Sequence, residues 1–271
     1  MTAVAAVALA AAAVLAWLIG APLVRARRRR AAMSIPLPTA LRAQLARNAP
    51  ACARLPAGLA ARHEALTNAF LAEKEFVGCD GLVVTDEIRV TIAGLASLLL
   101  LGRRGHYESL HSVLVYPGAF WVEDEVEDEA GVVERRRRDL SGEAWDASRI
   151  ILSWDDVLES VRYPGEGYNV VLHEFAHHLD AEGLGLATPD GARPRTLGAW
   201  SADLQREFEA LESAVERDED SFLDPYAAED PTEFFAVASE DFFERPVGLR
   251  EAHPRLHALL VEFYGVDPAG W

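Results

Sequence analysis

The stretch that decides the fold reads Tyr168-Asn169-Val170-Val171-Leu172-His173-Glu174-Phe175-Ala176-His177. Its apolar run before the first histidine is what a buried helix needs, and the helix is expected to run from about Asn169 to Gly183. Asn169 is a candidate N-cap and Gly183 a candidate end. Because residues four apart share one helix face, His173 and His177 can direct a ring nitrogen at the same metal ion.

Glu174 follows the first histidine and can reach a water molecule on such an ion and take its proton. The pattern therefore predicts one Zn²⁺ as cofactor and Glu174 as the general base of a hydrolase. The alternative is an amphipathic helix with two surface histidines. The apolar run before the motif argues against that alternative, because solvated histidines need no burial.

A catalytic zinc site takes three protein ligands and leaves one position for water. A third histidine six residues after His177 is excluded because position 183 is glycine. A glutamate shortly downstream is excluded too, because residues 183–202 contain none. The third ligand is therefore expected on a helix further along the chain.

That helix is predicted over residues 231–245, where Pro231 suits the first turn and Asp230 can cap it. Four phenylalanines within it indicate burial, so a carboxylate there needs a partner. Glu233 is the first choice for the third ligand, and Glu240 is the alternative.

Two neighbours of the second histidine have less defined roles. His178 should point about 100° away from His177 on a helix, so it is not expected to be a ligand. Asp180 lies on the metal face and could orient a ligand ring, or it could be a surface residue at the helix end.

Residues 1–24 contain no charged side chain, and Arg25–Arg30 follow with five arginines. This pattern predicts a transmembrane anchor with a basic stop over residues 1–30, a linker over residues 31–56 and a catalytic domain over residues 57–271. The arginines place the domain at the cytoplasmic face of the inner membrane. The alternative is an apolar leader left by a misplaced start codon, with a cytoplasmic protein.

The charge of the body excludes nucleic acid as an expected ligand. Without the five arginines of residues 25–30, 21 basic side chains stand against 43 acidic ones, and phosphate backbones repel such a body. The two cysteines, Cys52 and Cys79, have no metal-like spacing and fit a reducing compartment.

The remaining pattern predicts an α+β fold with a small mixed sheet beside the metal helix. Strands are expected at His111–Tyr116, a candidate edge for binding an extended substrate, and at Arg149–Ser153. Residues 123–139 are expected to form a loop or hairpin, and residues 184–198 a loop. Further helices are expected at 58–76, at 86–101 between a Thr85 cap and Gly102, at 199–218 and at 256–264.

Several further motifs resemble those of the Mlc titration factor A family of bacterial zinc peptidases, in the family's order over most of residues 40–268. They are Glu73-Lys74-Glu75-Phe76, Val115-Tyr116-Pro117 with Phe120, Ser141-Gly142-Glu143-Ala144-Trp145, Leu152-Ser153-Trp154-Asp155-Asp156, Leu223-Asp224-Pro225-Tyr226-Ala227-Ala228, and Phe263-Tyr264 with Asp267-Pro268. The stretch from Tyr226 to Phe235 is also similar to the active-site helix of the anthrax lethal factor protease domain.

The resemblance implies a zincin-like domain that cleaves a peptide or protein substrate, with Glu233 as third ligand and Tyr226 as transition-state stabiliser. A phenol can donate a hydrogen bond to the oxyanion, although Tyr226 also fits an ordinary turn. The competing function is a membrane-tethered binding protein that sequesters a regulatory protein such as a transcriptional repressor. Hydrolysis of a non-peptide bond stays open as a third function.

Overall fold

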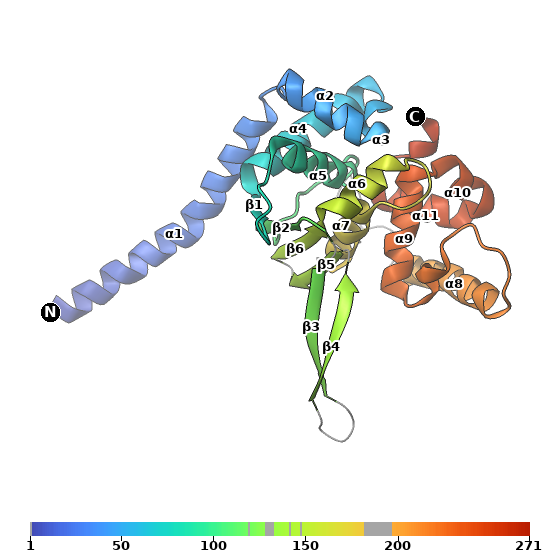
Figure 1. Cartoon of the computed structure of the whole chain (residues 1–271). Helices are drawn as coiled ribbons and strands as arrows, with labels where there is room; N and C mark the ends of the chain where they lie inside the picture. The colour runs from blue at the N-terminus through green and yellow to red at the C-terminus, as the bar shows by residue number, and fades with distance from the viewer. Residues whose placement is uncertain (1, 119, 128–132, 141, 147, 182–196) are drawn as a thin grey trace.

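A four-stranded mixed sheet lies beside the helices of the body (Figure 1). The computed structural model describes residues 2–118, 120–127, 133–140, 142–146, 148–181 and 197–271. In the order β1-β2-β6-β5, the strands β1 (Glu75–Gly78), β2 (Ser112–Tyr116) and β6 (Arg149–Ser153) are parallel, and β5 (Gly142–Asp146) is antiparallel to β6. The predicted α+β class and mixed sheet are confirmed.

The strand predicted as a substrate-binding edge is not an edge. Strand β2 pairs with β1 on one side and β6 on the other, so both rows of its backbone hydrogen-bonding groups are used inside the sheet. The edge strand that contacts the helix of the histidine motif is β5. The sequence predicted the strand correctly, but its neighbours come from segments far apart in the chain.

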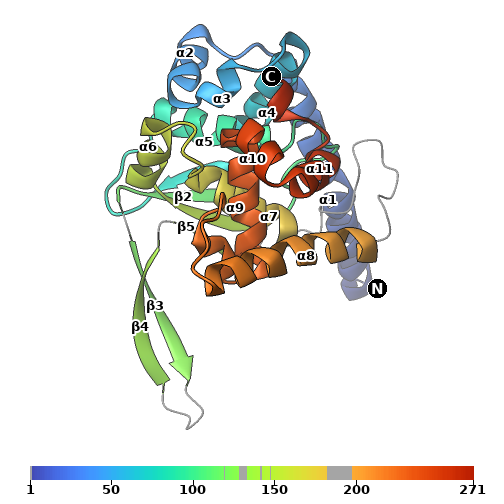
Figure 2. The same ribbon diagram turned by 90° about the vertical axis from the view of Figure 1, so that its right-hand side faces the viewer.

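The charged run at residues 123–139 was expected to be a loop or a hairpin, and its described residues, 123–127 and 133–139, belong to two paired strands. Strands β3 (Phe120–Glu127) and β4 (Val133–Leu140) pair in antiparallel register and project from the body as a separate two-stranded ribbon (Figure 2). The predicted loop at residues 184–198 lies outside the described residues except at its last two positions, which begin a helix.

Helix α5 (Asp86–Leu98) forms the centre of the core, and ten of its residues are buried. It begins as predicted, because Thr85 Oγ1 accepts a hydrogen bond from the Ile88 N–H. The helical elements after residue 56, besides α5, are α4 (Ala57–Glu73), α6 (Trp154–Arg162), α7 (Val170–Ala181), α8 (Leu197–Glu216), η2 (Pro225–Ala228), α9 (Pro231–Glu244), α10 (Pro246–Ala252), α11 (Pro254–Tyr264) and η3 (Pro268–Gly270), among the described residues. The predicted helix at 58–76 ends earlier, because residues 75 and 76 belong to β1.

The N-terminal segment forms one long helix, α1 (Thr2–Met33), which projects from the body (Figure 1). The predicted transmembrane anchor is not supported, because no helix within the described residues is long and apolar enough to cross a membrane. The basic end of α1 packs on α4, where Arg29 forms an ion pair of 3.1 Å with Glu73. The predicted basic stop therefore contacts the folded body.

The predicted linker is also largely helical. Residues 39–53 form α2 (Thr39–Asn48) and α3 (Pro50–Ala53), and Leu37, Leu45 and Ala51 are buried in the main core. These helices are short and have no capping side chain at their N-termini. Without a cap or a long periodic run, the sequence carried little signal for them.

The turn after α5 approaches the end of α11 closely at Gly102. A Cβ at this position would lie 2.4 Å from the backbone carbon and oxygen of Gly265 and from the Tyr264 carbonyl oxygen. Next to it, Arg103 donates a 2.7 Å hydrogen bond to the Phe263 carbonyl. Only glycine therefore fits where these two segments meet.

We expect Gly102→Ala to lower the free energy of unfolding by about 1–3 kcal/mol, because the added methyl group overpacks two backbones. Gly58→Ala is the matched control, since its Cβ would meet nothing within 4 Å and alanine is the better helix former. Urea unfolding measures both variants. Equal midpoints would contradict the close approach.

Candidate metal centre

Helices α7 and α9 pack against each other and carry the predicted metal ligands and Glu174 (Figure 2). Helix α7 begins as predicted, with the Leu172 N–H donating a 3.2 Å hydrogen bond to Asn169 Oδ1. Helix α9 begins at Pro231, and Asp230 Oδ1 accepts hydrogen bonds from the N–H groups of Thr232 and Glu233 at 2.7 and 3.0 Å. Both helix starts are thus fixed by side-chain caps.

The structure brings His173, His177 and Glu233 together between these helices. The two Nε2 atoms are 3.0 Å apart, and Glu233 Oε2 and Oε1 lie 3.1 Å from His173 Nε2 and 3.4 Å from His177 Nε2. One possible ligand atom from each residue lies within 4.8 Å of the others. Such a cluster of two imidazoles and a carboxylate matches the donor set of a catalytic zinc site.

The hydrogen bonds around this cluster fit a cation between the three side chains. His173 Nδ1 lies 2.8 Å from the carboxylate oxygen Oε1 of Glu240, so we assign the ring hydrogen to Nδ1 and a lone pair to Nε2. Glu233 Oε2 is buried and has no hydrogen-bond donor among the described residues, although His173 Nε2 is close. Acceptor atoms that face one another are satisfied by a metal ion.

The same arrangement attracts protons. Burial opposes the charged form of His173, but its contacts with Glu233 and Glu240 outweigh burial and raise its pKa to about 10. Burial also opposes the charge of Glu233, but the two imidazoles hold its pKa well below the usual range. A metal ion bound here would displace the protons that these groups otherwise hold.

Glu240, the alternative ligand, supports the site from behind. One carboxylate oxygen contacts His173 Nδ1, and the other accepts a hydrogen bond from the Asn169 N–H. Glu240 is 3% exposed. It contacts the Nδ1 edge of the His173 ring, so it cannot reach a metal ion at the Nε2 edge. It therefore fixes the orientation of His173, and it lies two turns after Glu233 on the same stripe of α9.

Glu174 is buried beside the two histidines. Burial raises its pKa to about 7, against the opposing influence of His173 and His177. A carboxyl group in that range can exchange a proton near neutral pH, as a general base must.

Tyr226 lies in the short helix η2, immediately before α9. Its ring centroid is 6.3 Å from that of His173, and its hydroxyl group lies close enough to Glu233 for the charge of that carboxylate to act on it. The side chain is 46% exposed. Partial burial, and then the charge of Glu233, raise the pKa of Tyr226 above its ordinary value, so the phenol stays a proton donor at neutral pH.

The two less defined neighbours lie apart from the cluster. His178 is buried on the opposite face of α7, with its ring centroid 5.5 Å from that of Tyr107 and its Nε2 3.4 Å from Ser109 Oγ. Asp180 is exposed at the end of α7. Partial shielding of its carboxyl group from water raises its pKa. The carboxylate that orients a ligand ring is Glu240, which the sequence had suggested as a ligand.

A family model described as glucose-regulated metallo-peptidase M90 matches residues 23–265. The chain belongs to this family. It is 38% identical over 208 residues to Mlc titration factor A of Pectobacterium atrosepticum, covering 75% of this chain and 78% of that protein. The resemblance to the Mlc titration factor A family is therefore confirmed.

Two further proteins are similar in sequence to this M90 chain. Mlc titration factor A of Serratia proteamaculans is 36% identical over 202 residues, with 73% of this chain and 76% of that protein covered. An uncharacterized protein of Synechocystis sp. is 36% identical over 236 residues, covering 86% of each chain. The family description suggests a metal-dependent peptidase, and the three converging side chains suit a metal ion.

In this M90 chain, Glu240→Gln should weaken zinc binding by about 10- to 100-fold, because His173 loses the carboxylate that orients its ring. Glu212→Gln is the matched control, since it makes the same charge change on the exposed face of α8. Zinc titration against a competing chelator measures both affinities. Equal affinities in the two variants would remove Glu240 from the site.

Proposed function

We propose that the protein is a zinc-dependent peptidase. The observation that carries the proposal is the convergence of His173, His177 and Glu233 beside the buried carboxyl group of Glu174. Zinc, when bound there, would polarise the substrate carbonyl and lower the pKa of a water molecule. The peptidase description of the family supports the same reaction class.

Glu174 is the proposed general base. Its carboxylate takes a proton from the attacking water and later passes it to the leaving amine. Because its pKa is about 7 and its side chain is buried, it can carry that proton between the two steps without losing it to solvent.

Tyr226 is the proposed donor to the oxyanion. Its hydroxyl group lies next to Glu233, and its exposed fraction leaves it accessible to a substrate. A phenol held at the site can donate a hydrogen bond to the oxygen that becomes negatively charged when water attacks the carbonyl.

Strand β5 is the proposed docking edge for the substrate backbone. It is an edge strand of the main sheet, and it contacts the metal helix α7. An extended peptide could pair with its backbone and present a carbonyl group to the site. This takes the role that the sequence suggested for β2.

We expect Glu174→Gln to keep its zinc and to lose peptide hydrolysis by about 10²–10⁴-fold, the usual contribution of a general base. Glu216→Gln, at the exposed end of α8, is the control for the lost charge. Zinc content and cleavage of a peptide library measure the two properties separately. A zinc-loaded Glu174→Gln protein with full activity would disprove the mechanism.

Tyr226→Phe removes only the hydroxyl group. We expect kcat to fall by about 10²–10³-fold, the cost of one oxyanion donor, with zinc content unchanged. Tyr163→Phe is the control, since Tyr163 is a similarly exposed tyrosine at the end of α6. If both variants kept the native kcat, Tyr226 would be a structural turn residue.

A second proposed function is the binding of a regulatory protein, which is supported by the name Mlc titration factor A of the relatives. It needs no metal, so His173→Ala separates the two functions. Retained binding of a repressor by the zinc-free variant would favour this function, whereas loss of both zinc and hydrolysis would support the peptidase. The location at the inner membrane stays a prediction.

A further inference from the structure

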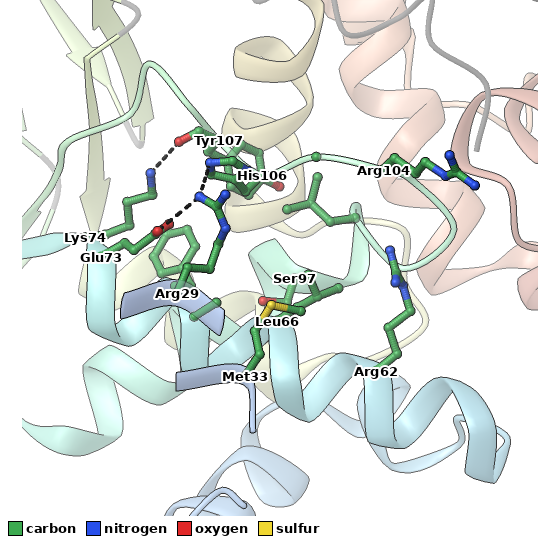
Figure 3. A pocket seen from close by; sticks show the side chains of 14 residues that line it. Arg29, Met33, Arg62, Leu66, Glu73, Lys74, Ser97, Arg104, His106 and Tyr107 are labelled. Carbon is green, nitrogen blue, oxygen red and sulfur yellow. Dashed lines mark hydrogen bonds and ion pairs between the residues drawn. The ribbon is translucent and has the colours of Figure 1, made fainter. Parts of the chain in front are cut away.

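A cavity of about 230 Å³ lies on the other side of the metal helix from α9, between the end of α1, α4 and the turn after α5 (Figure 3). Its lining has two kinds of surface. Apolar side chains of Met33, Leu66, Phe70 and Leu100 form one part. The cationic part is formed by Arg29, Arg62, Lys74 and Arg104.

The Arg62 guanidinium group is held in place but has no carboxylate partner among the described residues. Arg62 donates to the carbonyl groups of Leu101 and Arg103, and Lys74 donates to those of Tyr107 and Leu110. Hydrogen bonds to neutral carbonyl groups fix the direction of a cation without cancelling its charge.

Within the described part of the chain, Glu73 supplies the only carboxylate that lines the cavity, and it pairs with Arg29 at 3.1 Å. Arg29 also contacts His106, whose pKa is lowered by burial and by that neighbouring charge, so the imidazole adds little positive charge. Figure 3 shows these residues on one side of the cavity and Arg62 on the other. Arg62 and Arg104 therefore add positive charge beside a partly enclosed space, in a protein whose net charge is −17.

We propose that this cavity binds a small phosphate ester. Guanidinium groups suit phosphate oxygens, and the cavity lies below the roughly 300–1,000 Å³ of pockets for drug-sized ligands. The apolar lining takes the carbon part of the ester, and the cations take its phosphate group. The phosphate could belong to a soluble metabolite or to a lipid headgroup.

The cavity is one side-chain layer from the metal motif. Phe70 and Tyr107 line it, and their ring centroids lie 5.6 and 4.9 Å from that of Phe175. Phe175 follows Glu174 directly in α7. A ligand in the cavity would thus contact residues that pack on the side of α7 facing away from Glu233 and α9.

The test is calorimetric titration of the full chain with glycerol 3-phosphate at constant ionic strength. A titration with sodium chloride serves as the blank. We expect saturable binding at one site, weakened about tenfold or more by Arg62→Gln, because a charge-assisted hydrogen bond is lost. Arg89→Gln is the matched control. Like Arg62, Arg89 donates a hydrogen bond to a backbone carbonyl group, here that of Leu71, but it lies outside the cavity. It should bind like the native protein.

Arg104→Gln is the second variant, because Arg104 is exposed and forms no hydrogen bond among the described residues, so the fold should tolerate it. It should also weaken binding. The titration is repeated with zinc-free His177→Ala protein, because phosphate can bind a metal ion directly. Binding that persists there belongs to the cavity and is independent of the proposed peptidase site.

A parallel arm measures sedimentation with phosphatidylcholine vesicles that contain or lack phosphatidic acid. Loss of phosphatidic-acid-dependent sedimentation in Arg62→Gln, but not in Arg89→Gln, would identify a lipid headgroup as the source of the phosphate. Binding in the calorimetric arm alone would identify a soluble ester. No saturable binding in either arm, or equal weakening in Arg62→Gln and Arg89→Gln, would overturn the proposal.

Discussion

The site depends on one constraint, which is that two imidazole nitrogens and a carboxylate group face one another where α7 meets α9. Nε2 of His173, Nε2 of His177 and a carboxylate oxygen of Glu233 come within hydrogen-bonding distance of each other, yet the carboxylate of Glu240 holds the ring hydrogen of His173 on the far side. Such an arrangement is unfavourable unless protons or a cation occupy it. The packing of the two helices therefore makes sense as the framework of a metal centre.

A second layer of buried acids keeps the helices in this position. Asn169, the first residue before α7, is bonded to both Glu240 and Glu244 of α9, the latter through a 2.8 Å hydrogen bond from its side-chain amide. Asp241 is fully buried and pairs with Arg245 at 2.6 Å. Removing one member would leave a buried polar group without its partner, which costs about 1–3 kcal/mol or more. These acids explain why so polar a helix can lie within the core.

The parts of the fold that could be predicted from the sequence are those with local signals. The Thr85, Asn169 and Asp230 caps marked where three helices begin, and alternating or β-branched runs marked β2 and β6. Helices α2 and α3 had no such caps, so their residues read as a linker. The order of strands in the sheet depends on contacts between distant segments, which is why the edge strand was assigned to β2 instead of β5.

The sequence also predicted which residues gather at the site, but it did not predict that Glu240 orients a ligand ring. Helical spacing put His173 and His177 on one face, and Glu233 was preferred to Glu240 as the third ligand although both lie on the same stripe of α9. Only the three-dimensional arrangement separates them, since Glu233 faces both Nε2 atoms and Glu240 faces Nδ1 of His173. The cationic cavity had no sequence signal, because its residues come from three separate segments.

Anomalous diffraction at the zinc absorption edge tests the central claim most directly, using crystals of the zinc-loaded full-length protein. The structure predicts one strong peak bonded to His173 Nε2, His177 Nε2 and a carboxylate oxygen of Glu233, with Glu240 retained on His173 Nδ1. A peak elsewhere in the molecule, or a zinc ion bonded to Glu240 in place of Glu233, would contradict it.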